Sequence, residues 1–339
     1  MDARNQKRKE FVRNIGWDDA TSVVVAGDAS NRSYERLTKK DGKTAILMNA
    51  PPEKGEDVKP FIKILTHLRN NGLEAPALLE SDHGNGFLLL EDLGDDLFAR
   101  ICRTKPEQEK HLYKAAIDVL LKLHSAPIPT DVPPYDLAAY LRETDLVTDW
   151  YMPSIAGQVT SYTLVKSYRA EITTACDAIQ TPHSVLVLRD YHAENLLWLP
   201  ERNGIKNVGL LDFQDALIGH PAYDLVSLLE DARRDTSKEL QASMKSYFIE
   251  KSRVAKDAFE YAYAAIGAQR NLKIIGIFAR LCVRDAKSHY VDLIPRVWAH
   301  LQRDLNHPEL ASLKNWVDAH VPEPTPEVLT QIKEAQNAA

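Results

Sequence analysis

The sequence predicts an α+β protein built from two lobes, and three observations support this prediction. Strand-like runs alternate with turns through the first part of the chain. Helical periodicity dominates the rest, and a single β-hairpin pattern interrupts it between residues 184 and 215. We therefore expect a β-rich lobe at residues 1–93 and a helical lobe with an inserted hairpin at residues 94–339.

Composition excludes several classes of protein. The chain has 339 residues, of which 44% are hydrophobic and 27% charged, as in ordinary globular proteins. The net charge of −6 argues against a general nucleic-acid binder. No run approaches the roughly 18 apolar residues of a membrane span, and the first residues lack the apolar core of a signal peptide. We expect a cytoplasmic protein without nucleic-acid or membrane partners; the sequence leaves its oligomeric state open.

The first lobe begins with a short helix at residues 4–15 and continues with strands. The period changes near Thr21, and Lys39-Lys40-Asp41-Gly42 is a hairpin signal between two of the runs. The small residues between the first two strands, Gly27–Ser33, suit a turn whose N–H groups cover phosphates, although a plain hairpin turn fits equally well. The three expected strands are Ser22–Ala26, Tyr34–Thr38 and Lys43–Met48.

Helical spacing then takes over, apart from one buried strand. A helix is expected at Lys59–Asn71, where apolar residues recur every three to four positions. The apolar run within Gly86–Gly94 predicts a buried strand at the end of the first lobe. Helices are then expected at residues 108–123, 137–151, 164–179, 224–234, 238–251, 254–268, 271–288, 290–304 and 325–336.

The hairpin carries the polar residues on which the functional prediction depends. Its strands, Leu196–Leu199 and Val208–Leu211, flank the turn Arg202-Asn203-Gly204. Asp190 and Asn195 precede the first strand, and Asp212 ends the second. Folding brings them to one edge, where carboxylate and amide oxygens suit Mg²⁺ and one carboxylate can orient a hydroxyl. This set is typical of phosphoryl transfer, although solvated turn residues give the same pattern.

These residues resemble those of a known superfamily. Asp190-Tyr191-His192-Ala193-Glu194-Asn195, followed by Asp212-Phe213-Gln214, resembles the catalytic loop and metal motif of protein-kinase-like enzymes, in the form found in the aminoglycoside and choline phosphotransferase branch. Leu188 replaces the usual histidine and Gln214 the usual glycine. The order of elements matches along essentially the whole chain. The resemblance implies a bilobal protein-kinase-like fold that uses ATP and Mg²⁺.

The resemblance also assigns roles to residues. Asp190 would be the catalytic residue, and Asn195 and Asp212 would hold the metal. His192 and Asp224 would be structural, the first packing on the metal loop and the second acting as a brace or helix N-cap. The expected nucleotide contacts are Asp28, Ala29, Ser30, Asn31 and Arg32 in the covering turn, and the backbone of Glu91 and Leu93 in the hinge between lobes.

One departure from the pattern leaves a second interpretation open. Met48 stands where the superfamily has a phosphate-binding lysine, and helix Lys59–Asn71 has no acidic residue to pair with such a lysine. Mg²⁺, backbone N–H groups and Arg32, with Arg36 as a second candidate, would then neutralise the phosphates. A nucleotide-binding pseudokinase is the alternative to a working enzyme.

The acceptor is expected to be a small hydroxylated molecule. Only 11 residues lie between Asp212 and Asp224, without the longer segment and Ala-Pro-Glu motif of a protein kinase. The pieces Gly27–Ser30, Leu47–Glu53, Gly86–Gly94 and Leu188–Asn195 resemble the bacterial kinases that phosphorylate the C1 hydroxyl of N-acetylmuramate and N-acetylglucosamine in cell-wall recycling. Aminoglycoside, choline and homoserine remain alternatives.

Two arginines are the candidates for recognising the acceptor. Arg233 and Arg270 lie in polar, partly basic stretches after the metal motif. A guanidinium pairs with a carboxylate through two hydrogen bonds, which would suit the lactyl carboxylate of an amino sugar such as N-acetylmuramate. Surface ion pairs are the alternative explanation for both residues.

Overall fold

The structure, a computed structural model, describes residues 3–27, 31–177, 179 and 184–336. It contains two compact units. The sheet unit comprises residues 1–126 and 193–216, and the helical unit comprises residues 127–192 and 217–339. The sequence predicted a division after residue 93, whereas compactness groups the next two helices and the hairpin with the sheet. The α+β class is confirmed.

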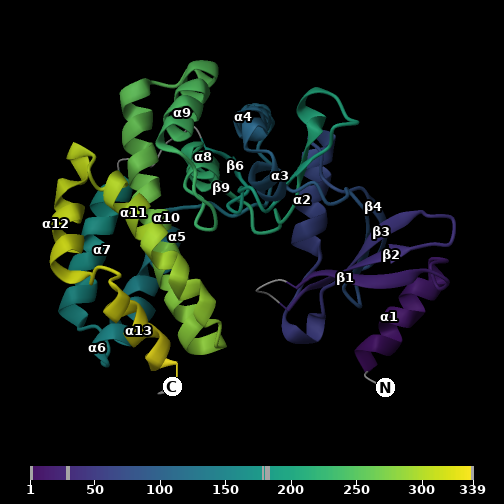
Figure 1. The fold of residues 1–339 in the computed structure, drawn as a ribbon, viewed down its shortest axis with the longest axis horizontal. Helices are drawn as coiled ribbons and strands as arrows, with labels where there is room; N and C mark the ends of the chain where they lie inside the picture. The colour runs from purple at the N-terminus through teal and green to yellow at the C-terminus, as the bar shows by residue number, and fades with distance from the viewer. Residues whose placement is uncertain (1–2, 28–30, 178, 180–183, 337–339) are drawn as a thin grey trace. The chain divides into compact units, whose positions relative to one another are not determined.

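The sheet unit is built on a five-stranded antiparallel sheet (Figure 1). The three strands expected from the alternating pattern are present, and Thr38 and Thr44 close the turn that Gly42 allows. Each strand runs antiparallel to its neighbours in the sheet. In spatial order the strands are β1 (Thr21–Gly27), β2 (Ser33–Thr38), β3 (Thr44–Asn49), β5 (Phe87–Glu91) and β4 (Leu78–Asp82).

One face of this sheet is covered by the first helix, α1 (Ala3–Asn14). Its buried Phe11 and Val12 pack with Leu47 of β3 and Phe87 of β5, and the rings of Phe11 and Phe87 stack at 5.5 Å between centroids. Ala45 and Leu47, two residues apart on β3, both belong to this apolar core. The remaining helices of this unit are α2 (Lys59–Asn70), α3 (Phe98–Thr104) and α4 (Glu109–His124).

The predicted hairpin is present and is tied to the sheet unit. Its strands β7 (Leu196–Trp198) and β8 (Val208–Leu210) pair in antiparallel register, joined through the 3₁₀ turn η4 (Gly204–Asn207). Leu210 N–H donates to Glu74 O at 2.8 Å, and Trp198 N–H donates to Asp96 O at 2.8 Å. These backbone bonds explain why the hairpin groups with the sheet, although the sequence predicted it as an insertion in the helical lobe.

The helical unit is arranged around one long helix, α10 (Lys256–Asp285), which contacts α5, α8 and α11 (Figure 1). A two-stranded sheet of β6 (Val185–Val187) and β9 (Leu217–Gly219) precedes α8. The other elements of this unit are α5 (Leu137–Leu146), the π-helical turn η3 (Val147–Tyr151), α6 (Met152–Ala156), α7 (Tyr162–Asp177), α8 (Ala222–Leu229), α9 (Lys238–Ser252), η5 (Ser288–Leu293), α11 (Ile294–Asp304), η6 (Pro308–Leu310), α12 (Ala311–His320) and α13 (Pro326–Ala335).

Two helix predictions were wrong. The helices expected at 254–268 and 271–288 form the single helix α10. The polar residues Gln269, Arg270 and Asn271, taken as a helix start, are instead almost fully buried. They are polar because they bond to other elements; Asn271, for example, donates to Glu230 at 2.8 Å. The helix expected at 224–234 ends at Leu229, where the next residues turn to meet these partners.

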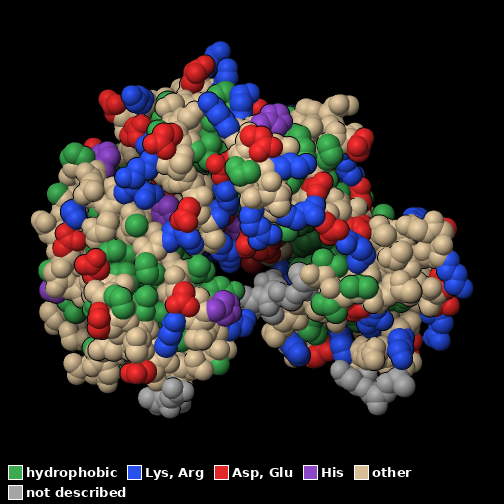
Figure 2. Space-filling model, in the orientation of Figure 1, with side chains coloured by type: hydrophobic (Ala, Val, Ile, Leu, Met, Phe, Trp, Pro, Cys, Tyr) green, Lys and Arg blue, Asp and Glu red, His purple; other side chains and the backbone are tan. Residues whose placement is uncertain are grey.

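Acidic and basic side chains are interspersed over both units in the view of Figure 2. This mixture agrees with the small net charge of the chain. In the part of the chain that the structure describes, no helix combines the length and the apolar character needed to cross a bilayer.

The close approach of Gly86 to Ala50 gives a test of the sheet unit. Gly86 has φ of +69°, and a Cβ there would lie 1.9 Å from the carbonyl oxygen of Ala50. We expect Gly86→Ala to lower the free energy of unfolding in urea by about 2 kcal/mol or more, since left-handed backbone alone costs an L-residue about 1–2 kcal/mol. In Gly84→Ala the new Cβ meets Asp82 at an ordinary 3.7 Å, so a change within about 0.5 kcal/mol is expected. Equal effects of the two substitutions would contradict the packing described.

Candidate active site

The segment that carries Asp190 is held by a buried carboxylate. Asp224, in the first turn of α8, is 0% exposed. Its Oδ2 accepts a hydrogen bond from Leu188 N–H at 2.7 Å, and its Oδ1 accepts one from Arg189 N–H at 2.9 Å. Both donors directly precede Asp190. These bonds support the bracing role expected for Asp224. They argue against the alternative role as a helix N-cap, because both carboxylate oxygens accept hydrogen bonds from the loop.

Several interactions that act in opposite directions set the pKa of the Asp224 carboxyl. Burial raises the pKa of its carboxyl to about 7, although the N–H groups of Leu188 and Arg189 work in the other direction. The nearby charge of Asp190 also raises this pKa, while Arg270 lowers it. An ionised carboxylate in this position therefore depends on the two backbone donors that it binds.

The backbone turns sharply immediately before Asp190. Asp190 N–H donates to Leu188 O at 2.9 Å, which closes a three-residue turn around Arg189. Arg189 has φ of +71°, a left-handed conformation that costs an L-residue about 1–2 kcal/mol. The residue pair Leu188–Arg189 is fixed by Asp224, and Ser227 Oγ donates to Arg189 O at 3.0 Å. Asp190 is partly exposed at the end of this turn, as a reacting carboxylate must be.

His192 is buried behind the loop and is 4% exposed. Its Nε2 lies 3.5 Å from a guanidinium nitrogen of Arg233. Burial lowers the pKa of His192 to about 4, with the charge of Asp231 opposing and that of Arg233 adding to the effect. A neutral, buried imidazole supports the structural role expected for His192 and is unsuited to exchange protons with solvent near pH 7.

The predicted metal ligands lie together in the sheet unit. Asn195 Nδ2 lies 3.4 Å from Asp212 Oδ2, and Leu211 N–H donates to Asn195 O at 3.0 Å. Asp212 is in left-handed backbone, with φ of +56°. The neighbouring Phe213 is fully buried and stacks on Phe61 of α2 at 4.9 Å between centroids. The hairpin and α2 therefore fix the position of the Asp212 side chain.

Gln214 completes this group, and sequence reasoning missed its role. Its Nε2 donates to Asp212 Oδ1 at 2.7 Å, so the carboxylate is oriented from both sides. Gln214 Oε1 is buried without a hydrogen-bond partner among the described residues. The signal in the sequence was Gln214 in the place of the usual glycine, which we took as common in the small-molecule branch and to which we assigned no function.

The donor set fits Mg²⁺. The oxygens of Asp212, the amide oxygen of Asn195 and the unsatisfied Oε1 of Gln214 are hard ligands of the kind that Mg²⁺ prefers. Within the described ranges no group of three or more His, Cys, Asp or Glu residues could hold a metal by itself. This agrees with the usual mode of Mg²⁺ in nucleotide enzymes, where one or two carboxylates and the phosphates share the ion.

Glu91, an expected hinge residue, forms hydrogen bonds within the sheet unit through both its backbone and its side chain. Its N–H donates to Ala77 O at 2.8 Å, and its side chain accepts from Ala77 N–H at 3.0 Å and Arg202 at 2.6 Å. Its backbone also pairs with Ala45 of β3. The Glu91 N–H is therefore committed to Ala77 O, and contacts of the Glu91 and Leu93 backbones with an adenine edge stay predictions.

The structure describes only part of the segment that is expected to cover the phosphates. The predicted contacts Asp28, Ala29 and Ser30 lie outside the described residues. Asn31 N–H donates to Glu56 Oε1 at 3.1 Å, and Arg32 Nε binds Glu56 Oε2 at 2.7 Å. Burial disfavours the charge on Arg32, but Glu56, Tyr34 and Asp215 raise its pKa overall.

Two expectations about phosphate neutralisation can be compared with the structure. Arg36, the second candidate, binds Asp92 through two nitrogens at 2.6 and 3.0 Å and also Asp95 at 2.8 Å, so its charge is already neutralised. Met48 is fully buried in β3 between Tyr34 and Leu88 of the neighbouring strands. A methionine there supplies packing in place of the lysine charge.

The two arginines expected to recognise the acceptor differ in exposure. Arg233 is exposed, beside His192, and its N–H donates to Asp231 Oδ1 at 2.8 Å. Arg270 is 5% exposed and donates to Ser227 Oγ at 2.9 Å, where it supports the loop that holds Arg189. Arg233 is therefore the better placed of the two to meet a ligand.

The structure thus brings Asn195 and Asp212 together, and it groups Asp190, His192 and Asp224 in the helical unit. The chain passes between the two units at His192 and Ala193. The approach of Asp190 to the metal pair stays a prediction.

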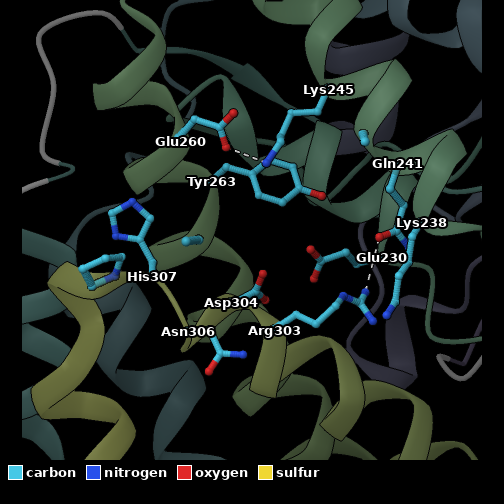
Figure 3. A pocket seen from close by; sticks show the side chains of 13 residues that line it. Glu230, Lys238, Gln241, Lys245, Glu260, Tyr263, Arg303, Asp304, Asn306 and His307 are labelled. Carbon is cyan, nitrogen blue, oxygen red and sulfur yellow. Dashed lines mark hydrogen bonds and ion pairs between the residues drawn. The ribbon is translucent and has the colours of Figure 1, made fainter.

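A hollow of about 490 Å³ in the helical unit is separate from these residues (Figure 3). Glu230 and Asp304 point into it, and Asn271 Nδ2 donates to both carboxyls, at 2.8 and 3.0 Å. Burial raises the pKa of Glu230 and of Asp304; the neighbouring Glu230 raises the pKa of Asp304 further, whereas a hydrogen bond with Asp304 lowers that of Glu230. No residue predicted for the active site lines this hollow.

The fold and these residues define a class of protein. A model of the phosphotransferase enzyme family matches residues 22–256, which is more than half of the chain. The chain belongs to this family. The predicted class of enzyme, an ATP-dependent kinase of small molecules, is confirmed.

Individual curated proteins and solved structures are also similar to this chain. The chain is 37% identical to N-acetylmuramate/N-acetylglucosamine kinase of Caulobacter vibrioides, over 94% of this chain and 97% of that protein. It is 34% identical to the protein of the same name from Pseudomonas aeruginosa, over 88% and 89%. A choline/ethanolamine kinase family protein of Mesorhizobium loti has a similar structure, with a TM-score of 0.61 at 13% identity, covering 98% of this chain and 99% of that one. The predicted protein-kinase-like fold is confirmed.

The low pKa of His192 predicts a pH effect on stability. Its folded pKa of about 4 lies below the usual 6.5, so the unfolded chain binds more protons between these values, and acidification weakens the fold. Between pH 6.5 and 5 this amounts to about 2 kcal/mol, at about 1.4 kcal/mol per unit. We expect His192→Gln to reduce by about that amount the stability lost between pH 7.5 and 5 in urea unfolding. The exposed His83→Gln serves as the control; a pH dependence unchanged in both variants would contradict a buried neutral His192.

Proposed function

We propose that the protein transfers the γ-phosphoryl group of ATP to the C1 hydroxyl of N-acetylmuramate or N-acetylglucosamine. The observation that carries this proposal is the similarity to curated kinases of that name, at 30–37% identity over 88–94% of the chain. The expected cytoplasmic location suits an enzyme that uses ATP and recovers sugars released from the cell wall.

Asp190 is the catalytic residue in this proposal. The turn at Arg189 fixes the carboxylate at the end of a rigid segment, and it is partly exposed. It orients the acceptor hydroxyl and accepts its proton as the new oxygen–phosphorus bond forms and the bond to the departing ADP breaks. A positioned acid–base group of this kind typically contributes 10² to 10⁴ in rate.

Asn195, Asp212 and Gln214 would hold Mg²⁺, which neutralises charge on the transferred phosphate when it is bound. The hydrogen bonds from Asn195 and Gln214 orient the Asp212 carboxylate. Arg32 and Asn31 meet the phosphates, and the Leu93 backbone meets the adenine edge. Arg32 compensates in part for the lysine that Met48 replaces, which requires its guanidinium to leave the ion pair with Glu56.

The buried Met48 is also the observation that favours the second candidate, a protein that binds nucleotide without turnover. Retention of Asp190, Asn195 and Asp212 favours the enzyme, because each of the three chemical roles still has its residue. An assay of ADP release with a panel of sugars and amino alcohols separates the candidates. Turnover confined to choline or an aminoglycoside would replace the proposed acceptor, and nucleotide binding without any turnover would indicate the pseudokinase.

Substitution of Asp190 tests the catalytic assignment. We expect Asp190→Asn to reduce kcat about 100-fold or more while ATP binding, followed by calorimetry, stays within about threefold. Asp177→Asn, a change to an exposed aspartate of α7, is the matched control and should keep full turnover. Activity of Asp190→Asn within a few-fold of the parent would remove Asp190 from the chemistry.

Arg233 tests the choice of acceptor. In the proposal its exposed guanidinium pairs with the lactyl carboxylate, which N-acetylmuramate has and N-acetylglucosamine lacks. A hydrogen bond to a charged group is worth about 1.5–3 kcal/mol, so Arg233→Ala should lower kcat/KM for N-acetylmuramate about tenfold or more relative to N-acetylglucosamine. Arg234→Ala is the neighbouring control, and equal losses for the two sugars would contradict the pairing.

A further inference from the structure

The strained residue before Asp190 is anchored through its side chain as well as its backbone. A guanidinium nitrogen of Arg189 binds Glu143 of α5, and the guanidinium lies 5.4 Å from the ring centre of Tyr135. Both partners of the Arg189–Glu143 pair are largely buried, with side-chain exposures of 19% and 14%. A glycine would adopt this turn without strain, so the arginine is disfavoured by its backbone and retained by its contacts.

Glu143 is the centre of a buried network that reaches three other elements. Its carboxylate also accepts hydrogen bonds from the Tyr135 hydroxyl, from Lys273 at 3.2 Å and from Gln269 at 3.4 Å, the last two in α10. Tyr223 of α8 links to Tyr135 and Lys273 through its hydroxyl, at 3.2 and 3.3 Å. Burial opposes ionisation of Glu143, yet the charges of Lys273 and Arg189 hold its pKa below the usual value.

We propose that Arg189 is a positioning residue, whose side chain, anchored on Glu143, fixes the left-handed turn that orients the Asp190 carboxylate. Asp224 and Ser227 hold the peptide groups of this turn, and the Arg189–Glu143 pair connects it to α5 and α10. Without the pair the turn is held at its peptide groups alone, its backbone is free to leave the left-handed conformation, and Asp190 loses its orientation. The inference rests on the proposed role of Asp190 and adds a residue to that site.

The test compares Arg189→Gly, Arg189→Lys and Glu143→Gln with the parent under saturating ATP and acceptor. Arg189→Gly relieves the backbone strain and deletes the anchor, so we expect kcat to fall about tenfold or more while KM for ATP stays within about twofold. Arg189→Lys keeps the charge and should recover part of the rate. Because Glu143→Gln weakens the same link, combining it with Arg189→Gly should add little to the loss of Arg189→Gly alone.

The chain supplies a matched control in Arg253, an exposed arginine that also has positive φ, at +58°. Arg253→Gly relieves similar strain far along the chain from Asp190 and should leave kcat unchanged. Full kcat in folded Arg189→Gly would overturn the inference, because a purely structural arginine alters stability and not the rate per folded molecule.

A second measurement does not depend on turnover. Hydrogen exchange of the Asp190 amide, which donates to Leu188 O, should become at least tenfold faster in Arg189→Gly and Glu143→Gln and stay unchanged in Arg253→Gly. An inactive parent with this exchange pattern would refute the proposed function and leave the positioning role standing. Unchanged exchange in the Arg189 and Glu143 variants would refute the positioning role.

Discussion

The segment that carries Asp190 depends on the carboxylate of Asp224. This side chain is fully buried, and its two oxygens accept the N–H groups of the two residues before Asp190. Burying a carboxylate is costly unless hydrogen bonds compensate for the lost hydration. Here the two hydrogen bonds that compensate for this cost also fix the conformation of the loop. Removing either partner therefore costs stability and loop geometry together. The positive φ of Arg189 persists because these bonds, with those of Ser227 and Glu143, hold the turn from several sides.

Much of the fold was predictable because its signals are local. The first three strands lie beside short turns, and the strand Phe87–Glu91 is a continuous apolar run, so turn residues and apolar runs were enough to find them. The short strand Leu217–Gly219 was missed because it has three residues and its partner, Val185–Val187, lies thirty residues earlier. The break expected near Gln269 was wrong because polar residues there indicated a helix boundary, whereas in the structure the amide nitrogens of Gln269 and Asn271 donate to other elements, to Tyr140 O and to Glu230.

The residue types of the site were predictable, but not their contacts. Asp212 and Asn195 come together as the hairpin required. Nothing in the sequence indicated that Arg36 would be neutralised by Asp92 and Asp95, because that pairing needs the strand order β2-β3-β5 to bring distant segments together. Likewise, the left-handed conformation of Arg189 has no sequence signal, since such positions are recognised by glycine. Strained conformations of this kind are common at functional sites, and rules based on local residue preferences do not predict them.

The most direct test of the kinase assignment is to identify the product itself. Phosphorus NMR of the protein with ATP, Mg²⁺ and N-acetylmuramate follows the nucleotide and the sugar in one sample. The account predicts a new phosphomonoester resonance coupled to the anomeric proton, growing in step with ADP and absent when Asp190→Asn replaces the parent. A resonance coupled to a proton elsewhere on the sugar would contradict the assigned hydroxyl, and ATP that persists unchanged with every acceptor would contradict the enzyme.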